Sequence, residues 1–320
     1  MSDDVLKVLV TGVTGLVGAA IAAELAARHF PVRALVRRES DIADLPEYAL
    51  APSFTSSGEL SIAVEDIDLV VHCAARVHIT SDGSKDPLSD YRTVNVQGSL
   101  FLARAAAAAG VSRFIFISSV KVNGEGTEPG QVYRENDQPA PQDPYGVSKA
   151  EAEQALRALA VETGMEVVII RPVLVYGPGV KANFRSMMNW LSKGVPLPLG
   201  ATGNKRSLVA LDNLVDLVVA CIDHPAAANQ TFLVSDGEDL STTELLQRMG
   251  KALGKPARLL PVPASLLRAG AAILGRRAVA QRLCGSLQVD ISKTRELLGW
   301  IPPVSVDDAL RKTALAFQAR

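Results

Sequence analysis

The chain has 320 residues, of which 48% are hydrophobic, and a formal net charge of −1. Such a length suffices for one large domain or two joined domains with a sizeable core. The near balance of acidic and basic residues gives no electrostatic case for a nucleic-acid-binding protein, so no nucleic-acid partner is expected.

The N-terminal residues and the cysteines indicate the cellular location of the protein. Its first ten residues, "MSDDVLKVLV", have acids where a signal peptide has basic residues. No apolar stretch approaches the roughly 20 residues that span a bilayer, so we expect no membrane span and a cytoplasmic location. Cys73, Cys221 and Cys284 lie far apart. They show the spacing of neither a disulfide framework nor a metal site, so no metal is expected.

Short runs of Val, Ile and Leu alternate with helical patterns through the first half of the chain. Continuous apolar strands separated by helices predict an α/β fold with a doubly wound parallel sheet of the Rossmann type, covered on both faces. The strands are predicted at "KVLVTG" (7–12), "VRALVR" (32–37), "DLVVHCAA" (68–75), "FIFISS" (114–119) and "MEVVIIRP" (165–172).

A glycine-rich loop, "VTGVTGLVG" (10–18), follows the first strand and opens a helix. Gly12 permits a tight turn, Gly15 lets the backbone approach a pyrophosphate, and Gly18 lets helix and sheet pack closely. The placement of the loop therefore predicts a dinucleotide cofactor at the helix N-terminus. The predicted contacts in this loop are Gly12, Thr14, Gly15, Leu16, Val17 and Gly18.

The end of the second strand, "ALVRRES", bears on which dinucleotide is bound. NAD-binding sheets usually carry a carboxylate there, whereas this chain carries Arg37 and Arg38. Guanidinium groups pair well with the ribose phosphate of NADP, so NADP(H) is predicted as the preferred cofactor. A solvated basic strand end is the alternative, and NAD(H) stays open because Glu39 and Asp41 follow closely.

The stretch "PQDPYGVSKAEAEQAL" (141–156) predicts a helix that begins beside a tyrosine. Asp143 is a good N-cap and Pro144 suits the first helical position. Tyr145 and Lys149 are then one turn apart on one face of that helix. The ammonium group beside the phenol, together with a positively charged nicotinamide, is expected to lower the phenol pKa towards the range of general acid–base catalysis.

Two serines, Ser118 and Ser119, end the strand before this helix and should emerge at the same sheet edge as Tyr145 and Lys149. A hydroxyl, a phenol and an ammonium together suit hydride transfer to or from a carbonyl carbon. Ser119 would hold the reacting oxygen, and Tyr145 would exchange the proton.

Beyond residue 172 the pattern loosens into stretches rich in Gly and Pro. The stretch "STTE" at Ser241–Glu244 predicts a capping box that opens a helix. We predict that residues 1–172 bind the dinucleotide, with roughly 207–235 rejoining their sheet. Residues 173–320 would mainly form a smaller substrate lobe over the strand ends, where such sheets bind ligands.

Eight motifs occur in one order along the chain: "TGVTGLVG", "HCAA", "VNVQG", "ISSVKVNGE", "YGVSK", "RPVLVYGPG", "KRSLVALDNL" and "DISKTRELLGW". Over essentially its whole length the chain resembles the extended short-chain dehydrogenase/reductases of the nucleotide-sugar epimerase/dehydratase family. The resemblance implies that Ser119, Tyr145 and Lys149 are catalytic, with Lys149 also holding the nicotinamide ribose. It implies that Asn95 braces the Tyr145 helix. Further implied cofactor contacts are Glu59, Leu60, Cys73, Ala74, Ala75, Asn95 and Pro172.

The resemblance also implies that the C-terminal lobe binds a UDP-sugar, whose pyrophosphate Asn183, Arg206 and Arg282 would grip. Leu174 stands where many relatives place asparagine, so one substrate contact is lost or supplied elsewhere. Relatives often form homodimers through the helices that contain Asn95 and Tyr145, and we expect the same here. The implied substrate contacts are Val77, Lys121, Asn183, Leu199, Arg206 and Arg282.

Three reactions occur on this scaffold. Dehydratases of the family carry an Asp-Glu pair where this chain has Val120 and Lys121, so the resemblance disfavours dehydration. The run "SSVKVNGE", followed by "KANFRSMMNWL", resembles bacterial 4-ketoreductases. With NADPH this favours reduction of a UDP-linked 2-acetamido-2,6-dideoxy-4-hexulose to UDP-N-acetylquinovosamine or UDP-N-acetylfucosamine, for surface polysaccharide (O-antigen).

Two alternatives stay open. A UDP-glucose or UDP-N-acetylglucosamine 4-epimerase would keep NAD⁺ bound and return the hydride to the other face of the sugar. A non-catalytic NADP-binding sensor would keep the glycine loop and lose the catalytic tyrosine, so the presence of Ser119, Tyr145 and Lys149 disfavours it.

Overall fold

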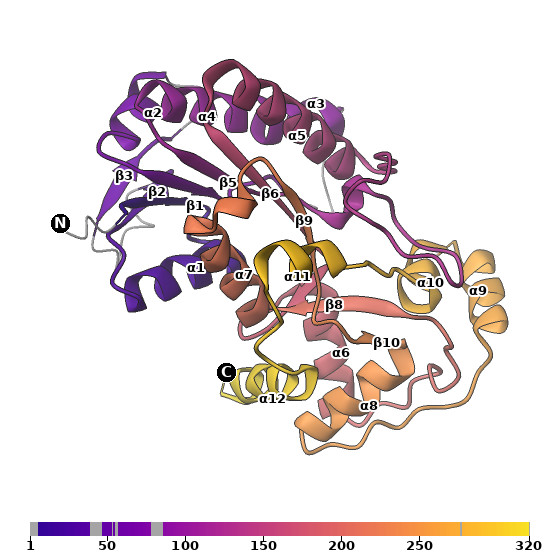
Figure 1. The fold of residues 1–320 in the computed structure, drawn as a ribbon. Helices are drawn as coiled ribbons and strands as arrows, with labels where there is room; N and C mark the ends of the chain where they lie inside the picture. Colours follow the sequence, from indigo (N-terminus) through magenta and orange to yellow (C-terminus); the bar gives the residue numbers. More distant parts are fainter. Residues whose placement is uncertain are drawn as a thin grey trace.

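The computed structural model describes residues 6–38, 47–52, 54, 57–77, 86–275 and 277–319. Within these residues the main sheet has seven strands in the order β3-β2-β1-β4-β5-β6-β9, and every neighbouring pair is parallel (Figure 1). The predicted doubly wound parallel sheet is therefore confirmed. The strands are β1 (Val8–Thr11), β2 (Val32–Val36), β3 (Tyr48–Leu50), β4 (Leu69–His72), β5 (Arg113–Ile117), β6 (Glu166–Pro172) and β9 (Thr231–Val234).

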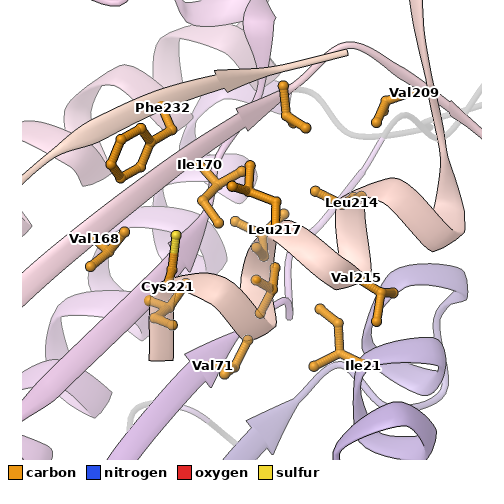
Figure 2. Packing of buried hydrophobic residues seen from close by; sticks show 14 of the residues in the cluster. Ile21, Val71, Val168, Ile170, Val209, Leu214, Val215, Leu217, Cys221 and Phe232 are labelled. Carbon is orange, nitrogen blue, oxygen red and sulfur yellow. The ribbon is translucent and has the colours of Figure 1, made fainter. Parts of the chain in front are cut away.

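One face of this sheet is covered by α1 (Leu16–Ala27) and α7 (Leu211–Asp223). Ile21 of α1 and Leu217 of α7 lie in the same fully buried cluster as Val71 of β4 (Figure 2). Burial of such a side chain contributes about 1.5–3 kcal/mol. The cluster thereby holds α1, and the glycine loop that precedes it, against the sheet.

The opposite face is covered by α2 (Ser57–Ala63), α4 (Ser99–Ala108) and α5 (Pro144–Thr163). Leu102 of α4 and Leu156 of α5 are fully buried in a second cluster on this side. Because successive strand residues point to opposite faces, each central strand feeds both clusters. This explains why its residues read as continuous apolar runs.

A second, smaller sheet lies among the C-terminal helices (Figure 1). Its order is β10-β8-β7, with β7 (Leu174–Tyr176), β8 (Arg206–Ala210) and β10 (Asp239–Leu240). None of the helices in the described residues is long and apolar enough to cross a membrane. The remaining helices are α3 (Pro87–Tyr91), η2 (Arg92–Gly98), η3 (Val120–Val122), α6 (Ala182–Ser192), η4 (Pro225–Ala227), α8 (Thr242–Ala252), α9 (Ala264–Ile273), α10 (Arg277–Cys284), α11 (Ser292–Leu298) and α12 (Val306–Gln318).

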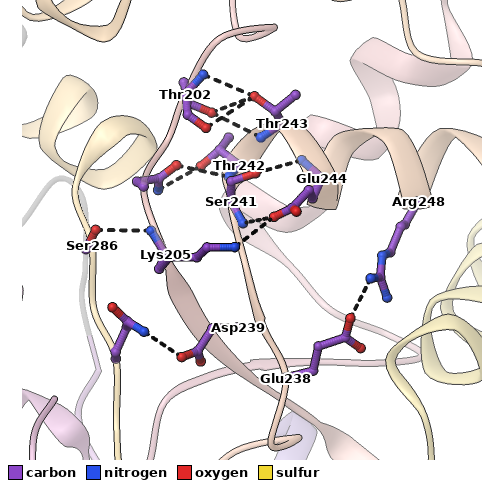
Figure 3. Close-up of polar contacts among 12 residues, drawn as sticks. Thr202, Lys205, Glu238, Asp239, Ser241, Thr242, Thr243, Glu244, Arg248 and Ser286 are labelled. Atoms are coloured by element: carbon purple, nitrogen blue, oxygen red, sulfur yellow. Dashed lines mark hydrogen bonds and ion pairs between the residues drawn. The ribbon is translucent and has the colours of Figure 1, made fainter. Parts of the chain in front are cut away.

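Hydrogen bonds tie the start of α8 to the segment that leads into β8 (Figure 3). The predicted capping box is confirmed, because Ser241 Oγ accepts from the Glu244 N–H at 3.1 Å and Glu244 Oε2 accepts from the Ser241 N–H at 2.7 Å. The Thr243 N–H donates to Thr202 Oγ1 at 3.1 Å, and the Thr202 N–H donates to Thr243 Oγ1 at 3.2 Å. These bonds fix the chain shortly before Arg206, the first residue of β8.

Candidate active site

The loop between β1 and α1 has the shape that a pyrophosphate requires. Gly12 has a φ of +72°, a left-handed conformation that side chains rarely adopt. A Cβ on Gly12 would lie 2.8 Å from the Ala74 nitrogen, and one on Gly18 would lie 2.3 Å from the Gly12 oxygen. Gly15 caps α1 without a side chain, so the positive end of the helix faces the loop.

The predicted adenosine contacts lie at the ends of β2 and α2. Glu59 is in the first turn of α2, and its Oε2 is buried without a hydrogen-bond partner among the described residues. A buried carboxylate oxygen needs a donor, and the adenine amino group would supply one. Arg37 and Arg38 are exposed directly after β2, whereas Glu39 and Asp41 lie outside the described residues. The loop and Glu59 therefore fit a dinucleotide.

A π-helical turn, η2, joins α3 to α4 and carries Asn95 at a fully buried position. Asn95 Oδ1 accepts from the Arg76 N–H at 2.8 Å, and Asn95 Nδ2 donates to Arg76 O at 3.1 Å. Nδ2 also donates to Ser148 Oγ at 2.9 Å. Asn95 thus joins the loop after β4 to α5, the helix that carries Tyr145. Although the motif singled out Asn95, no sequence signal indicated the π turn.

His72, the last residue of β4, lies in a buried hydrogen-bond chain that sequence reasoning missed. Its Nδ1 is 2.8 Å from Thr11 Oγ1, and its Nε2 is 2.9 Å from Ser99 Oγ. Since Thr11 Oγ1 already accepts from two backbone N–H groups and Ser99 donates to a backbone carbonyl, we assign the ring proton to Nε2. Burial, helped by the charge of Lys149, lowers the pKa of His72 to about 3. The ring is therefore neutral at neutral pH.

Tyr145 lies in the first turn of α5, close to Ser119. The predicted N-cap is confirmed, because Asp143 Oδ1 accepts from the Gly146 N–H at 2.6 Å and Pro144 opens the helix. Ser119 directly precedes η3, and its side chain lies close enough to the Tyr145 phenol to lower the phenol pKa. A phenol and a hydroxyl are thus in contact at the carboxyl end of β5.

Lys149 follows one turn later on α5 and is 1% exposed. Its Nζ donates to Ile117 O at 2.8 Å and lies 4.2 Å from the centre of the Phe116 ring. The structure therefore brings the three predicted catalytic residues to one end of β5. Burial lowers the pKa of Lys149 to about 8, so the ammonium form is retained near neutral pH.

The pKa of Tyr145 is shifted in the direction opposite to the one expected. Burial raises it, the nearby Asp143 carboxylate adds to the rise, and the Ser119 side chain opposes it. The expected lowering by Lys149 is wrong for this structure, because that ammonium is directed at a backbone carbonyl and an aromatic ring of β5. Without further positive charge beside it, the phenol stays protonated.

Arg206 joins β8 to the end of α10. Its guanidinium donates to Arg282 O at 3.1 Å and to Gly285 O at 3.2 Å. Burial lowers the pKa of Arg206, and the carboxylate of Glu125 opposes that shift. The side chain of Arg282 is exposed. The two predicted pyrophosphate ligands are therefore joined by the bond from the Arg206 guanidinium to the Arg282 backbone carbonyl, and not by their side chains.

Lys121 lies two residues after Ser119 and is half-buried between two acids. Its Nζ is 2.5 Å from Asp143 Oδ2 and 2.8 Å from Glu125 Oε1. Asp143 caps α5, and the charge of Glu125 opposes the fall in the Arg206 pKa. Lys121 therefore links the Tyr145 helix to the charged groups beside β8.

The other predicted substrate contacts are scattered over the fold. Asn183, in the first turn of α6, and Val77, after β4, are exposed, and so is Leu174 of β7. Leu199 is buried in the core of the smaller lobe, where its carbonyl accepts from Thr243 Oγ1 at 2.6 Å. Of these residues, Val77 lies near Tyr145, because its carbonyl accepts from the Tyr91 hydroxyl at 3.4 Å and the Tyr91 ring centre lies 6.1 Å from that of Tyr145.

Comparison with known proteins places the chain in a class. Residues 8–235 match the family model described as the NAD dependent epimerase/dehydratase family. The match spans more than half of the chain, and the chain therefore belongs to this family of enzymes.

A Vibrio cholerae protein named UDP-glucose 4-epimerase is 49% identical over 313 residues, which cover 97% of this chain and 95% of that protein. Among solved structures, UDP-glucose 4-epimerase from Thermotoga maritima, solved with UDP-glucose, has a TM-score of 0.79 at 21% identity and covers 98% of this chain and 99% of its own. UDP-glucose 4-epimerase from Thermus thermophilus, a complex with NAD, has a TM-score of 0.78 at 23% identity, with coverages of 98% and 99%.

These similarities contradict the predicted 4-ketoreductase that would make UDP-N-acetylquinovosamine or UDP-N-acetylfucosamine. A relative that matches nearly the whole chain at 49% identity is named as an epimerase. The prediction depended on Arg37 and Arg38, which favoured NADPH, and on the resemblance of "SSVKVNGE" and "KANFRSMMNWL" to bacterial 4-ketoreductases. The charge after β2 affects which dinucleotide is held, but it does not decide whether the hydride returns to the sugar.

Proposed function

We propose that this enzyme is a UDP-hexose 4-epimerase of the UDP-glucose type, which interconverts UDP-glucose and UDP-galactose. The observation that carries the proposal is the near full-length similarity, at 49% identity, to a protein named UDP-glucose 4-epimerase. The contact between Ser119 and Tyr145 beside a buried Lys149 supports it, because these groups suit proton exchange at a hydroxyl that becomes a carbonyl.

In the proposed mechanism the C4 hydroxyl of the sugar lies against Ser119 and Tyr145. When bound, the oxidised dinucleotide supplies a hydride acceptor and a positive charge that lowers the Tyr145 pKa. Tyr145 takes the proton of the C4 hydroxyl while Ser119 holds the oxygen. After the keto sugar has turned its other face to the site, Tyr145 returns that proton and the C4 configuration is inverted.

We propose that Lys149 holds the nicotinamide ribose, and that the glycine loop, Glu59 and Leu60 hold the rest of the dinucleotide. Arg206 and Arg282 would meet the substrate pyrophosphate, with Asn183 opposite them. Because these proposed dinucleotide contacts lie in residues 1–172 and the substrate contacts in residues 173–320, we propose a dinucleotide domain (1–172) and a substrate lobe (173–320). A homodimer through the outer faces of α4 and α5 stays a prediction, which light scattering of the purified protein tests.

A direct test uses the purified protein and UDP-glucose without any added dinucleotide. Proton NMR should show UDP-galactose accumulating to a constant ratio. Absence of interconversion, with oxidation of added NADPH by a 4-keto UDP-sugar, would refute the epimerase.

Tyr145→Phe tests the role of the phenol. Since general acid–base catalysis typically contributes 10²–10⁴-fold, we expect kcat to fall by about 10³-fold. The affinity for the dinucleotide, measured by calorimetry, should be unchanged. A variant that keeps its rate would remove Tyr145 from the chemistry, and a parent protein that binds dinucleotide without turnover would support the sensor alternative.

A further inference from the structure

Helix α5 carries three functional groups at four-residue intervals, which places them on one face. Tyr145 and Lys149 belong to the proposed mechanism. The third, Glu153, has no part in it, yet its side chain is only 4% exposed. A buried carboxylate is costly unless it is paired and hydrogen-bonded, so its partners reveal what it holds.

Glu153 joins α5 to the ends of β5 and β6. Its Oε1 accepts from Ser118 Oγ at 2.6 Å and from Arg171 Nε at 2.9 Å. Its Oε2 accepts from Arg171 Nη2 at 2.6 Å and from Arg157 Nη2 at 3.0 Å. Arg171, 3% exposed, thus grips Glu153 with two parallel bonds, the strongest geometry for such a pair.

Arg171 reaches the other side of the Ser119 segment as well. Its Nη1 donates to Asn123 Oδ1 at 3.0 Å. Asn123 directly follows η3, and Ser119 directly precedes it. Ser118 and Asn123 therefore bracket Ser119 and η3, and one buried ion pair holds both of them.

We propose that Glu153 and Arg171 are positioning residues that fix the Ser119 hydroxyl against the Tyr145 phenol. The inference rests on the proposed function, because it gives the ion pair a task in that reaction. A carboxylate on the Tyr145 helix and a guanidinium on β6 together clamp the residues on either side of Ser119, so the helix and the serine keep one relative position. Small displacements of reacting groups are known to cost up to about 10²-fold in rate.

The charge of Glu153 also reaches Lys149. Lys149 is faced by Glu153 on its own helix, by His72 and Cys73 at the end of β4, and by the ring and carbonyl end of β5. His72 is neutral, and burial raises the pKa of Cys73 to about 12. Cys73 and Glu153 both oppose the fall in the Lys149 pKa that burial causes, and Glu153 is the carboxylate of the two.

Ser118→Ala is the first test, because it removes one bond to Glu153 and leaves the ion pair intact. We expect kcat to fall about tenfold and thermal stability to fall modestly, with KM and dinucleotide affinity nearly unchanged. Glu153→Gln should lower kcat further and move the alkaline limb of the kcat–pH profile to lower pH, because Lys149 then loses its proton more easily. If Glu153→Gln does not fold, the kcat of Ser118→Ala alone tests the proposed positioning role.

Glu166→Gln is the matched control. Glu166 Oε2 pairs with Arg113 Nη2 at 2.6 Å, and the Arg113 side chain is 8% exposed, but this pair joins the opposite ends of β5 and β6. The control should change stability and leave both kcat and the alkaline limb in place. Full activity of Ser118→Ala would overturn the inference. The proposed function fails separately, when the parent protein itself interconverts no UDP-sugars.

Discussion

Burial sets the protonation of single residues at this site more than their neighbours' charges do. His72, Cys73, Tyr145 and Lys149 are all shifted towards their neutral forms, and burial is the largest cause for each. The spacing of Tyr145 and Lys149 is visible in the sequence, but their burial is not. The chain's own residues therefore do not supply the expected lowering of the Tyr145 pKa.

His72 leads to a prediction about stability. Histidine titrates near 6.5 in the unfolded chain, and burial lowers the pKa of His72 to about 3 in the fold. Between these values the unfolded state binds more protons, so the free energy of unfolding falls as the pH drops below 6.5. We expect a loss of about 2 kcal/mol between pH 7 and pH 5 from this group. Urea titrations should show that loss reduced in His72→Gln; an equal loss in the variant would contradict the assignment.

Arg37 and Arg38 lead to a second prediction at this scale. Hydrogen bonds to a charged group contribute about 1.5–3 kcal/mol each, and about 1.4 kcal/mol corresponds to a tenfold change in affinity. Replacing both arginines by alanine should therefore weaken NADP binding by tenfold or more and leave NAD binding nearly unchanged. Calorimetric titration with each dinucleotide measures this. Equal losses of affinity for NADP and NAD would show that the two arginines do not contact the ribose phosphate.

At the scale of elements, long patterns were predictable and short or tertiary ones were not. The start of α5 followed from Asp143 and Pro144, and the main strands from their apolar runs. Strands β3, β7 and β10 went unpredicted because two or three residues carry too little periodicity. Strand β8 went unpredicted because it follows a stretch rich in Gly and Pro. The pairing of Glu153 with Arg171 joins α5 to β6, and no sequence pattern indicates it.

Two helical glycines give a prediction for α1. Alanine in a helix is normally more stable than glycine by about 1 kcal/mol, and Gly270 of α9 has open space for a Cβ. At Gly18 the same Cβ would meet the Gly12 oxygen at 2.3 Å. We expect Gly270→Ala to keep or raise the melting temperature.

Gly18→Ala should lower stability by about 1–3 kcal/mol and weaken dinucleotide binding, because α1 must move away from the loop. Thermal unfolding and dinucleotide titration of both variants measure these effects. Shifts of the same sign in the two variants would show that helix propensity, not close packing of the loop, decides the outcome.

At the scale of the whole molecule, the carboxyl ends of β1, β4 and β5 bring together the glycine loop, the Asn95 contacts and the three residues predicted to be catalytic. The family motifs were sufficient to name these residues. The motifs did not distinguish epimerisation from net reduction. That distinction depends on whether the keto sugar rotates inside the site before it leaves. That is a property of the complex, which no single residue type specifies.

Retention of the C4 hydrogen tests the proposed epimerase most directly. UDP-glucose labelled with deuterium at C4 is incubated with the purified protein in ordinary water, without added dinucleotide, and the product is examined by NMR and mass spectrometry. A 4-epimerase returns the same hydride to the same carbon, so UDP-galactose should carry the deuterium at C4. UDP-galactose that has lost the label, or no UDP-galactose at all, would contradict the proposed reaction.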